Sequence, residues 1–279
     1  MTILRLEHHL LEPFGAEVEL DLSRELAPAE AAALRDLFFE RSLLVFRNQN
    51  LGMEDQQRVV SYVGPLLAPS SGYLSPEDGI LNTKRLDFHS DLCSTPLPFD
   101  AISLHAQEVD EQRTFTKFAS GLRAYGLLPK ATQELIETLQ VNMVQTVADK
   151  TRLAYEVPAN ALNIIRPVVL RHRATGSPIL YCSESSAARI EGWARPESDA
   201  LLAELFAALY APSNIYRHHW RNGDLVIWDN LSLQHGRDAV EPGAPRRLQR
   251  VVAGLKTLRE QAPAYDLTPV ITEVGRATN

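Results

Sequence analysis

A histidine and an aspartate two positions apart, His89 and Asp91, form the most informative short pattern of this chain. On an extended segment, side chains two apart point to the same face, so both groups would face one spot. Taken alone, this pattern is more typical of a surface histidine beside an acid. With a second histidine, it would complete the two-histidine, one-carboxylate set that binds Fe(II) and leaves coordination positions open. We expect His235 to be that third ligand, and only the fold can bring it to the other two.

Composition narrows the class of protein. The chain has 279 residues, 45% of them hydrophobic, with a net charge of −7 and two cysteines. This balance argues against nucleic acid or an anionic membrane as a partner, and two cysteines cannot build a disulfide framework. No segment looks like a signal peptide or a membrane-spanning helix. We therefore expect one domain over residues 1–279, located in the cytoplasm and acting on a small molecule.

Hydrophobic periodicity predicts many short strands with a few helices between them. The helix predicted for 28–41 begins with Pro28, which suits a first turn, and places Leu34, Leu37 and Phe38 on one stripe. Other helices are predicted for 53–62, 130–140 and 199–210. Strands are predicted within 10–22 and for 42–46, 101–105, 114–118, 168–173, 178–181, 215–220, 225–228 and 248–255.

This order of elements predicts a fold class. Short strands separated by turns, with helices outside, are typical of a mostly β protein in which two antiparallel sheets close into a jelly roll of the cupin type, also called a double-stranded β-helix. In such a fold, we expect the metal ligands at one mouth of the barrel. The segment 73–87, predicted to be a loop, would lie beside them. Tyr73, Arg85, Phe88 and Leu92 are candidates for contact with a substrate because they are near His89 and Asp91 in the sequence.

An ordered set of short segments makes the chain similar to a known family. The segments are Gly15-Ala16-Glu17-Val18, Leu43-Leu44-Val45-Phe46-Arg47-Asn48-Gln49, His89-Ser90-Asp91, Thr116 with Phe118-Ala119-Ser120, Pro167-Val168-Val169, Trp220-Arg221-Asn222-Gly223-Asp224, Trp228-Asp229-Asn230, and His235 with the arginines after it. Together they resemble the taurine and 2,4-dichlorophenoxyacetate dioxygenases, the TauD/TfdA-like family. These enzymes are Fe(II)- and 2-oxoglutarate-dependent dioxygenases with a double-stranded β-helix fold.

The resemblance implies a reaction and its cofactors. His89, Asp91 and His235 would bind Fe(II), and 2-oxoglutarate and O2 would be consumed while a C–H bond of a small organic, anionic substrate is oxidised, with release of succinate and CO2. Halogenases of the family lack the carboxylate, so Asp91 favours hydroxylation, or a related cleavage or desaturation. A homodimer or homotetramer would fit the relatives.

The resemblance also implies a site for the cosubstrate. Thr116 matches a threonine whose hydroxyl contacts 2-oxoglutarate, and Arg246 stands where the family has the arginine that clamps its distal carboxylate. Arg250 matches an arginine that meets an anionic substrate in some members, and we include it with the cofactor-binding residues. The last strand looks one residue short of the family pattern, which leaves Arg247 as an alternative clamp.

Departures from the family keep other functions open. The family usually has Gly-Gly-Asp before the threonine, where this chain has Glu111-Gln112-Arg113-Thr114-Phe115, and often has tryptophan where Phe88 stands. The main alternative is a metal-binding jelly roll without turnover that serves as a binding or regulatory module. A third interpretation is a cupin oxygenase or isomerase that needs no 2-oxo acid.

Overall fold

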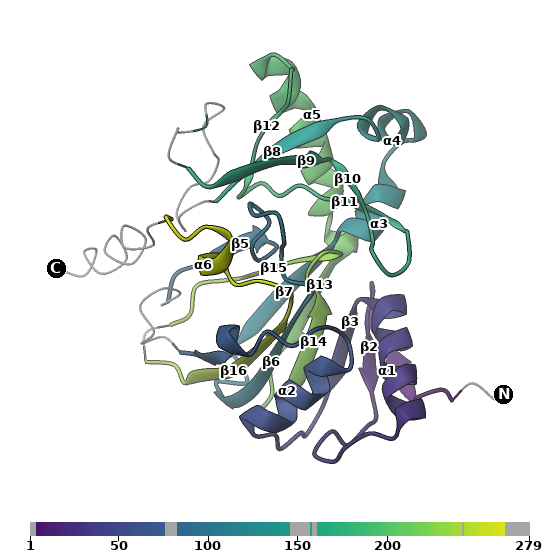
Figure 1. Ribbon diagram of the computed structural model, residues 1–279, viewed down its shortest axis with the longest axis vertical. Helices are drawn as coiled ribbons and strands as arrows, with labels where there is room; N and C mark the ends of the chain where they lie inside the picture. The colour runs from purple at the N-terminus through teal and green to yellow at the C-terminus, as the bar shows by residue number, and fades with distance from the viewer. Residues whose placement is uncertain (1–3, 76–82, 146–156, 158–160, 242, 266–279) are drawn as a thin grey trace.

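Two β-sheets that face each other form the centre of the molecule (Figure 1). The computed structural model describes residues 4–75, 83–145, 157, 161–241 and 243–265. In spatial order, the larger sheet contains β1 (His8–Leu10), β2 (Ala16–Val18), β3 (Leu43–Phe46), β14 (Leu225–Asp229), β6 (Ala101–Val109), β16 (Arg246–Ala253) and β4 (Gly72–Leu74). The smaller sheet contains β13 (Ile215–His219), β7 (Phe115–Ser120), β15 (Leu233–Arg237) and β5 (Leu86–His89).

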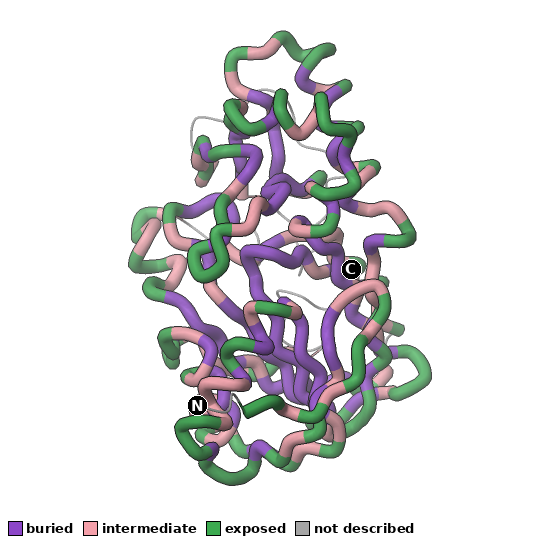
Figure 2. The backbone as a smooth tube through the Cα atoms, turned by 90° about the vertical axis from the view of Figure 1, so that its right-hand side faces the viewer, coloured by how far each residue is buried: buried purple, intermediate pink, exposed green. Residues whose placement is uncertain are grey.

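Apolar side chains from both sheets fill the space between them. Phe118 of β7 meets Trp228 of β14 edge to face, with ring centroids 5.3 Å apart, and both side chains are almost fully buried. Figure 2 shows how the buried stretches run through the middle of the molecule while exposed segments lie outside. The two facing sheets confirm the predicted jelly-roll architecture.

Strand β3 shows why an unbroken apolar run forms part of this core. Its side chains alternate between two apolar environments: Leu43 and Val45 enter the space between the sheets, and Leu44 and Phe46 pack on the outer side. Helices α1 (Pro28–Arg41) and α2 (Met53–Ser61) cover that outer side, where Phe38 of α1 is buried with the same cluster. The predicted bounds of α1 are confirmed.

A smaller layer lies above the jelly roll in Figure 1. The predicted hairpin is confirmed there, because Val169 of one strand pairs with Leu180 of the other. The predicted helix over 130–140 is wrong at its end: α4 stops at Ile136, and Gln140 begins a strand with partners on both sides. The elements of this layer are α3 (Gly121–Leu127), α4 (Lys130–Ile136), β8 (Gln140–Val144), β9 (Asn163–Pro167), β10 (Val169–Arg171), β11 (Pro178–Leu180), β12 (Ala187–Ile190) and α5 (Arg195–Leu209).

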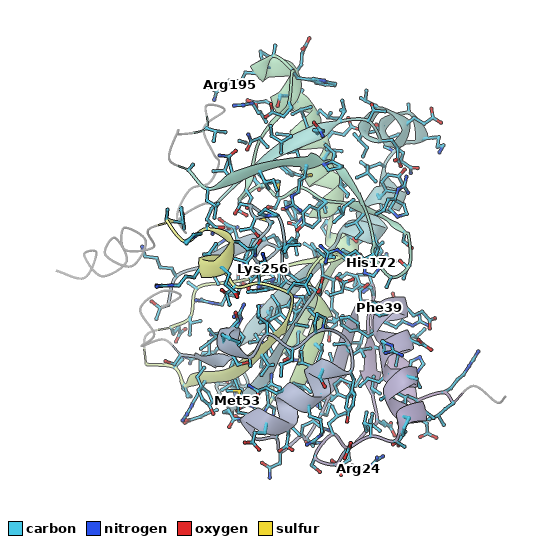
Figure 3. The ribbon with its side chains drawn as sticks, in the orientation of Figure 1. Arg24, Phe39, Met53, His172, Arg195 and Lys256 are labelled. Atoms are coloured by element: carbon cyan, nitrogen blue, oxygen red, sulfur yellow. The ribbon has the colours of Figure 1, made fainter. Side chains whose placement is uncertain are left out.

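Contacts of His172 join this layer to the jelly roll. Its ring lies 5.7 Å from the ring of Phe39 on α1, and both residues are labelled in Figure 3. Its Nε2 lies 2.8 Å from an oxygen of Asp229 at the end of β14, with both side chains almost fully buried. The remaining short elements are η1 (Ala68–Ser70), η2 (Pro212–Asn214) and α6 (Leu258–Gln261). Within the described ranges, no helix has the length and apolar character needed to cross a membrane.

Candidate active site

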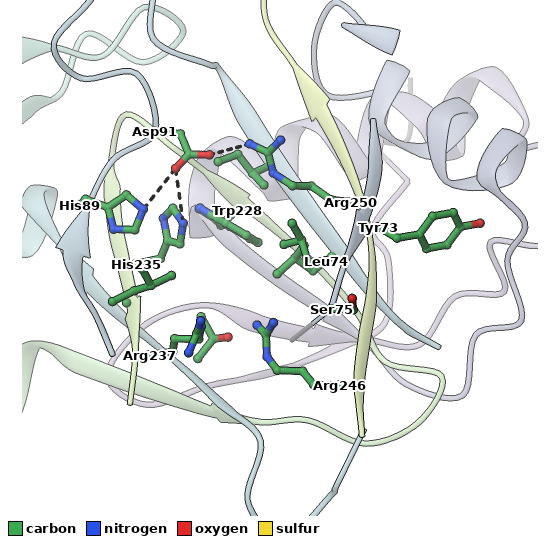
Figure 4. A pocket seen from close by; sticks show the side chains of 15 residues that line it. Tyr73, Leu74, Ser75, His89, Asp91, Trp228, His235, Arg237, Arg246 and Arg250 are labelled. Carbon is green, nitrogen blue, oxygen red and sulfur yellow. Dashed lines mark hydrogen bonds and ion pairs between the residues drawn. The ribbon is translucent and has the colours of Figure 1, made fainter. Parts of the chain in front are cut away.

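Strands β5 and β15 bring together two histidines that are far apart in the chain. The strands run antiparallel, and His89 stands directly opposite His235 in their register. Side chains of opposite residues share one face of the sheet, and the two imidazole rings are 4.4 Å apart. Asp91 lies two residues after the end of β5, and Figure 4 shows its carboxylate directed at both rings.

The three side chains form a compact donor set. Asp91 Oδ1 lies 3.3 Å from His89 Nε2 and 3.7 Å from His235 Nε2, and all three possible ligand atoms lie within 4.8 Å of one another. Ligand atoms about 2.1 Å from a metal ion and at right angles around it stand about 3 Å apart. The observed spacing therefore fits one metal ion bound on a single face.

Hydrogen bonding and burial prepare the two histidines for this role. His89 Nδ1 lies 2.8 Å from the Asp87 carbonyl, which can only accept, so Nδ1 carries the hydrogen and Nε2 faces Asp91. Burial lowers the pKa of His89, but the hydrogen bond and charge of Asp91 outweigh it, so the net shift is upward. Burial and the charge of His89 lower the pKa of His235 to about 3, so its imidazole is neutral at neutral pH.

Arg250 holds the other oxygen of Asp91. Its guanidinium donates to Asp91 Oδ2 over 2.6 Å and to the Ser70 carbonyl over 3.2 Å. Burial alone would raise the pKa of Asp91, but the hydrogen bond from His89 and the charge of Arg250 outweigh it and hold that pKa below its ordinary value. Asp91 is therefore a carboxylate, with one oxygen on Arg250 and one facing the imidazoles.

Asn230 fixes the main chain of Asp91. Its Oδ1 accepts from Asp91 N over 2.8 Å, and its Nδ2 donates to the carbonyls of Asp91 and Phe99 over 3.0 Å each. The next residue, Leu92, has a φ of 60°, which is uncommon for a residue other than glycine. The fully buried amide therefore supports an irregular turn at the point where the carboxylate must be aimed.

We expect Asn230→Ala to weaken binding of Mn(II) or Fe(II) by about 10- to 100-fold, the range found when a group that orients a metal ligand is removed. The physical reason is that Asp91 loses three hydrogen bonds in its neighbourhood, two of them on its own main chain. Titration of the metal-free protein with Mn(II) measures the change. Asn163→Ala, at an exposed position of β9, is the matched control. Wild-type affinity in Asn230→Ala would show that the turn holds its shape without the amide.

A cavity of about 300 Å³ extends from the three groups into the jelly roll. Both sheets contribute to its wall, so its shape depends on how they pack. Figure 4 shows its charged groups at two places, one around Asp91 and one around Arg237 and Arg246, with Leu74 and Trp228 between them. Arg237 and Arg246 are more deeply buried than Asp91, so their place is the deep end of the cavity. The lining residues are Tyr73, Leu74, Ser75, Leu86, His89, Asp91, Ile102, Leu104, Thr116, Trp228, His235, Gly236, Arg237, Arg246 and Arg250.

Thr116 lines the cavity with a hydroxyl whose orientation is set by a tryptophan. Thr116 Oγ1 accepts a hydrogen bond of 2.9 Å from the indole Nε1 of Trp220, a fully buried side chain. Because the indole can only donate, the hydroxyl hydrogen of Thr116 is available to a ligand in the cavity. The sequence drew attention to Trp220 only as part of a family segment, since nothing local shows which hydroxyl it would reach.

The structure distinguishes the two adjacent arginines of β16. Arg246 lines the cavity and is 7% exposed, and burial together with the charge of Arg237 lowers its pKa to about 10. Arg247 is exposed and lies over the ring of Tyr73, 4.6 Å from its centroid. Arg246 and Arg250 both reach the cavity, as their common strand parity predicted.

The four candidates for substrate contact lie in different places. Tyr73 lines the cavity. Arg85 is exposed and pairs with Asp87 over 2.8 Å, and Phe88 stacks on Tyr210 with ring centroids 5.0 Å apart. Among the residues that the structure describes, Arg85, Phe88 and Leu92 do not line this cavity. The predicted loop over 73–87 is wrong at its ends, because β4 includes Tyr73 and β5 begins at Leu86. Its middle, residues 76–82, lies outside the described ranges.

Comparison with known proteins gives one consistent result. Residues 7–252 match the family model described as "Taurine catabolism dioxygenase TauD, TfdA family". The chain is 28% identical to the alpha-ketoglutarate-dependent 2,4-dichlorophenoxyacetate dioxygenase of Cupriavidus pinatubonensis, covering 90% of this chain and 97% of that protein. A 96-residue stretch is 44% identical to tyrosine isonitrile desaturase of Pseudomonas aeruginosa, covering 30% of this chain and 33% of that protein.

A solved structure extends the likeness to three dimensions. The crystal structure of AAD-2 in complex with Mn(II) and N-oxalylglycine matches with a TM-score of 0.75 and 25% sequence identity, covering 91% of this chain and 99% of that one. The likeness therefore extends over most of the fold.

Proposed function

The chain belongs to the TauD/TfdA family of dioxygenases, and on this basis we propose that His89, Asp91 and His235 hold its catalytic iron. Enzymes of this family use Fe(II), 2-oxoglutarate and O2, and the chain is accordingly a 2-oxoglutarate-dependent dioxygenase acting on a small molecule. The observation that carries the proposal is the convergence of the three ligand atoms within 4.8 Å of one another. Two imidazoles and one carboxylate suit ferrous iron and leave one side of the ion for other ligands.

We assign the cosubstrate to the cavity beside these ligands. Its deep end offers the buried guanidinium of Arg246 and the hydroxyl of Thr116, which suit the distal carboxylate of 2-oxoglutarate. Arg250 lies at the iron end, where it holds Asp91 and adds a positive charge for the 2-oxo acid or for an anionic group of the substrate. A dianion bound in this way would have a cation at each end.

The iron and the residues around it have different roles in the proposed reaction. When bound, the iron supplies O2 activation, coupled to conversion of 2-oxoglutarate into succinate and CO2 and to oxidation of a substrate C–H bond. His89 and His235 present Nε2 lone pairs, and the Asp87 carbonyl keeps the His89 ring in the required tautomer. Arg250 and Asn230 hold the Asp91 carboxylate and its main chain in place.

We propose a small anionic organic molecule as the substrate, oxidised by hydroxylation. The name of the relative from Cupriavidus pinatubonensis specifies an aryloxyacetate, which is an anion at neutral pH. The relative from Pseudomonas aeruginosa is named a desaturase, so product mass is the deciding measurement. Hydroxylation adds one oxygen, whereas desaturation removes two hydrogens.

The test has two stages. Anaerobic addition of Fe(II) and 2-oxoglutarate to the metal-free protein should produce a weak visible charge-transfer band. Aerobic incubation with aryloxy acids, amino acids, sulfonates and alkyl sulfates should then release succinate, most strongly with the true substrate. A band without succinate from any compound would favour a binding module without turnover, and turnover without any need for a 2-oxo acid would favour another cupin reaction.

A further inference from the structure

Two arginines, Arg237 and Arg246, line the end of the cavity away from Asp91. Three arginines line the cavity, and Asp91 is the only carboxylate among its described lining residues. Asp91 pairs with Arg250 at the iron end. Arg237 and Arg246 therefore give the other end two positive charges with no acidic side chain in the described wall.

Arg246 is a buried cation for which the described part of the chain provides no partner. Its side chain makes no hydrogen bond or ion pair with any residue that the structure describes, and its Nε is buried and unsatisfied. Burying a guanidinium in this way costs free energy unless an anion compensates its charge. Burial and the charge of Arg237 lower its pKa to about 10, so it remains charged at neutral pH and lies within electrostatic reach of the second arginine.

Arg237 is held in a position to share the same anion. It stands two residues after His235 on β15, so both side chains face the cavity. Its Nη1 donates to the Lys84 carbonyl over 2.6 Å and to the Asp238 carbonyl over 3.3 Å, and it is 3% exposed. Figure 4 shows the guanidinium groups of Arg237 and Arg246 directed toward each other across the cavity.

The glycine before Arg237 allows the close strand pairing that positions it. A Cβ added to Gly236 would lie 2.8 Å from the Leu86 carbonyl oxygen of β5, too close for any other residue. Strands β5 and β15 can approach here only because the side chain is absent. The same approach brings the Lys84 carbonyl within reach of Arg237.

We propose that Arg237 joins Arg246 in binding the distal carboxylate of 2-oxoglutarate, which is then held between two guanidinium groups. The inference deepens the proposed function and rests on it, and it gives Arg237 a role that the family resemblance does not imply. A carboxylate has two oxygens and about four lone pairs, enough to accept from two guanidiniums. Its negative charge also relieves the repulsion between the two buried cations.

The test compares two ligands that differ only at the distal end. 2-Oxopentanoate has the carbon chain of 2-oxoglutarate with a methyl group in place of the distal carboxylate. Binding of each to the Fe(II)-loaded protein is measured without oxygen, from the charge-transfer band. We expect Arg237→Met to raise the Kd of 2-oxoglutarate by about 10- to 100-fold and to change that of 2-oxopentanoate by less than about twofold.

Two further variants complete the design. Arg237→Lys keeps the charge and loses the planar fork, so its Kd for 2-oxoglutarate should fall between those of the wild type and Arg237→Met. Arg217→Met, at a half-exposed arginine of β13 in the same sheet, should match the wild type for both ligands.

Three outcomes would overturn the assignment. Equal weakening of both ligands in Arg237→Met would make Arg237 a purely structural residue. An unchanged Kd for 2-oxoglutarate in that variant would remove it from the site. Absence of 2-oxoglutarate binding in the wild-type protein itself would instead overturn the proposed function, and this inference with it.

Discussion

Arg246→Met is expected to raise the Kd of 2-oxoglutarate by about 100-fold or more, and Arg247→Met to change it by less than about twofold. The large figure corresponds to about 3 kcal/mol, within the range for removing one partner of a buried, hydrogen-bonded charge pair. Arg246 lines the cavity and is buried, whereas Arg247 lies over the exposed ring of Tyr73. The neighbouring substitution is a matched control, since it removes the same side chain from the same strand.

Although Arg246→Met should weaken binding of 2-oxoglutarate, it should stabilise the ligand-free protein. Burial lowers the pKa of Arg246 to about 10, which means that folding disfavours its charged form at every pH below that value. Removing the charge should therefore raise the melting temperature of the ligand-free protein, by about 2 to 5 °C for a chain of this size. The further rise that 2-oxoglutarate causes in the metal-loaded protein should shrink. Thermal melts with and without ligand measure both changes.

A stronger effect of Arg247→Met than of Arg246→Met on 2-oxoglutarate binding would contradict the register of β16 in the structure. The sequence alone left this choice open, because the last strand is one residue short of the family pattern. In the structure, β16 pairs with β6 through a register shift between Arg247 and Leu248, yet Arg246 and Arg250 still reach the same cavity. The irregularity belongs to the pairing of two distant strands, and no local pattern indicates it.

The elements that the sequence predicted best are those with a complete local signal. Helix α1 has Pro28 in its first turn and an apolar stripe that α1 buries on the sheet, and both of its ends were predicted correctly. Strand β3 is an apolar run because both of its faces are buried. The helix predicted for 130–140 was too long because Gln140 pairs with Pro167 and so begins β8, and that partner lies far along the chain.

The sequence likewise predicted those parts of the site that have a local signal. Residue type and spacing pointed to His89 and Asp91, but their union with His235 required strands β5 and β15 to be neighbours. The supporting contacts were harder still to predict. The hydrogen bonds between Trp220 and Thr116 and between Asn230 and the main chain of Asp91 are 2.8 to 3.0 Å long. They depend on side-chain positions that spacing in the sequence does not determine.

Asp91→Ala is expected to reduce succinate formation by more than about 1,000-fold, because the proposed iron site would lose its carboxylate. The change also acts on the neighbours of that carboxylate. Arg250 would lose its ion pair while remaining mostly buried, and Nε2 of His89 would lose the carboxylate that it faces. Arg250 and His89 would then lie at the metal position without a compensating negative charge, so iron binding itself should weaken.

Iron content after gel filtration and succinate release from the purified variant measure these two effects separately. Asp36→Asn, an exposed aspartate on α1, controls for loss of one acidic residue. If Asp91→Ala retained both iron and turnover, the carboxylate would have no place in the metal site. If it retained iron but lost turnover, two imidazoles would suffice to hold the ion, and the role of Asp91 would lie in the charge it adds between His89, His235 and Arg250.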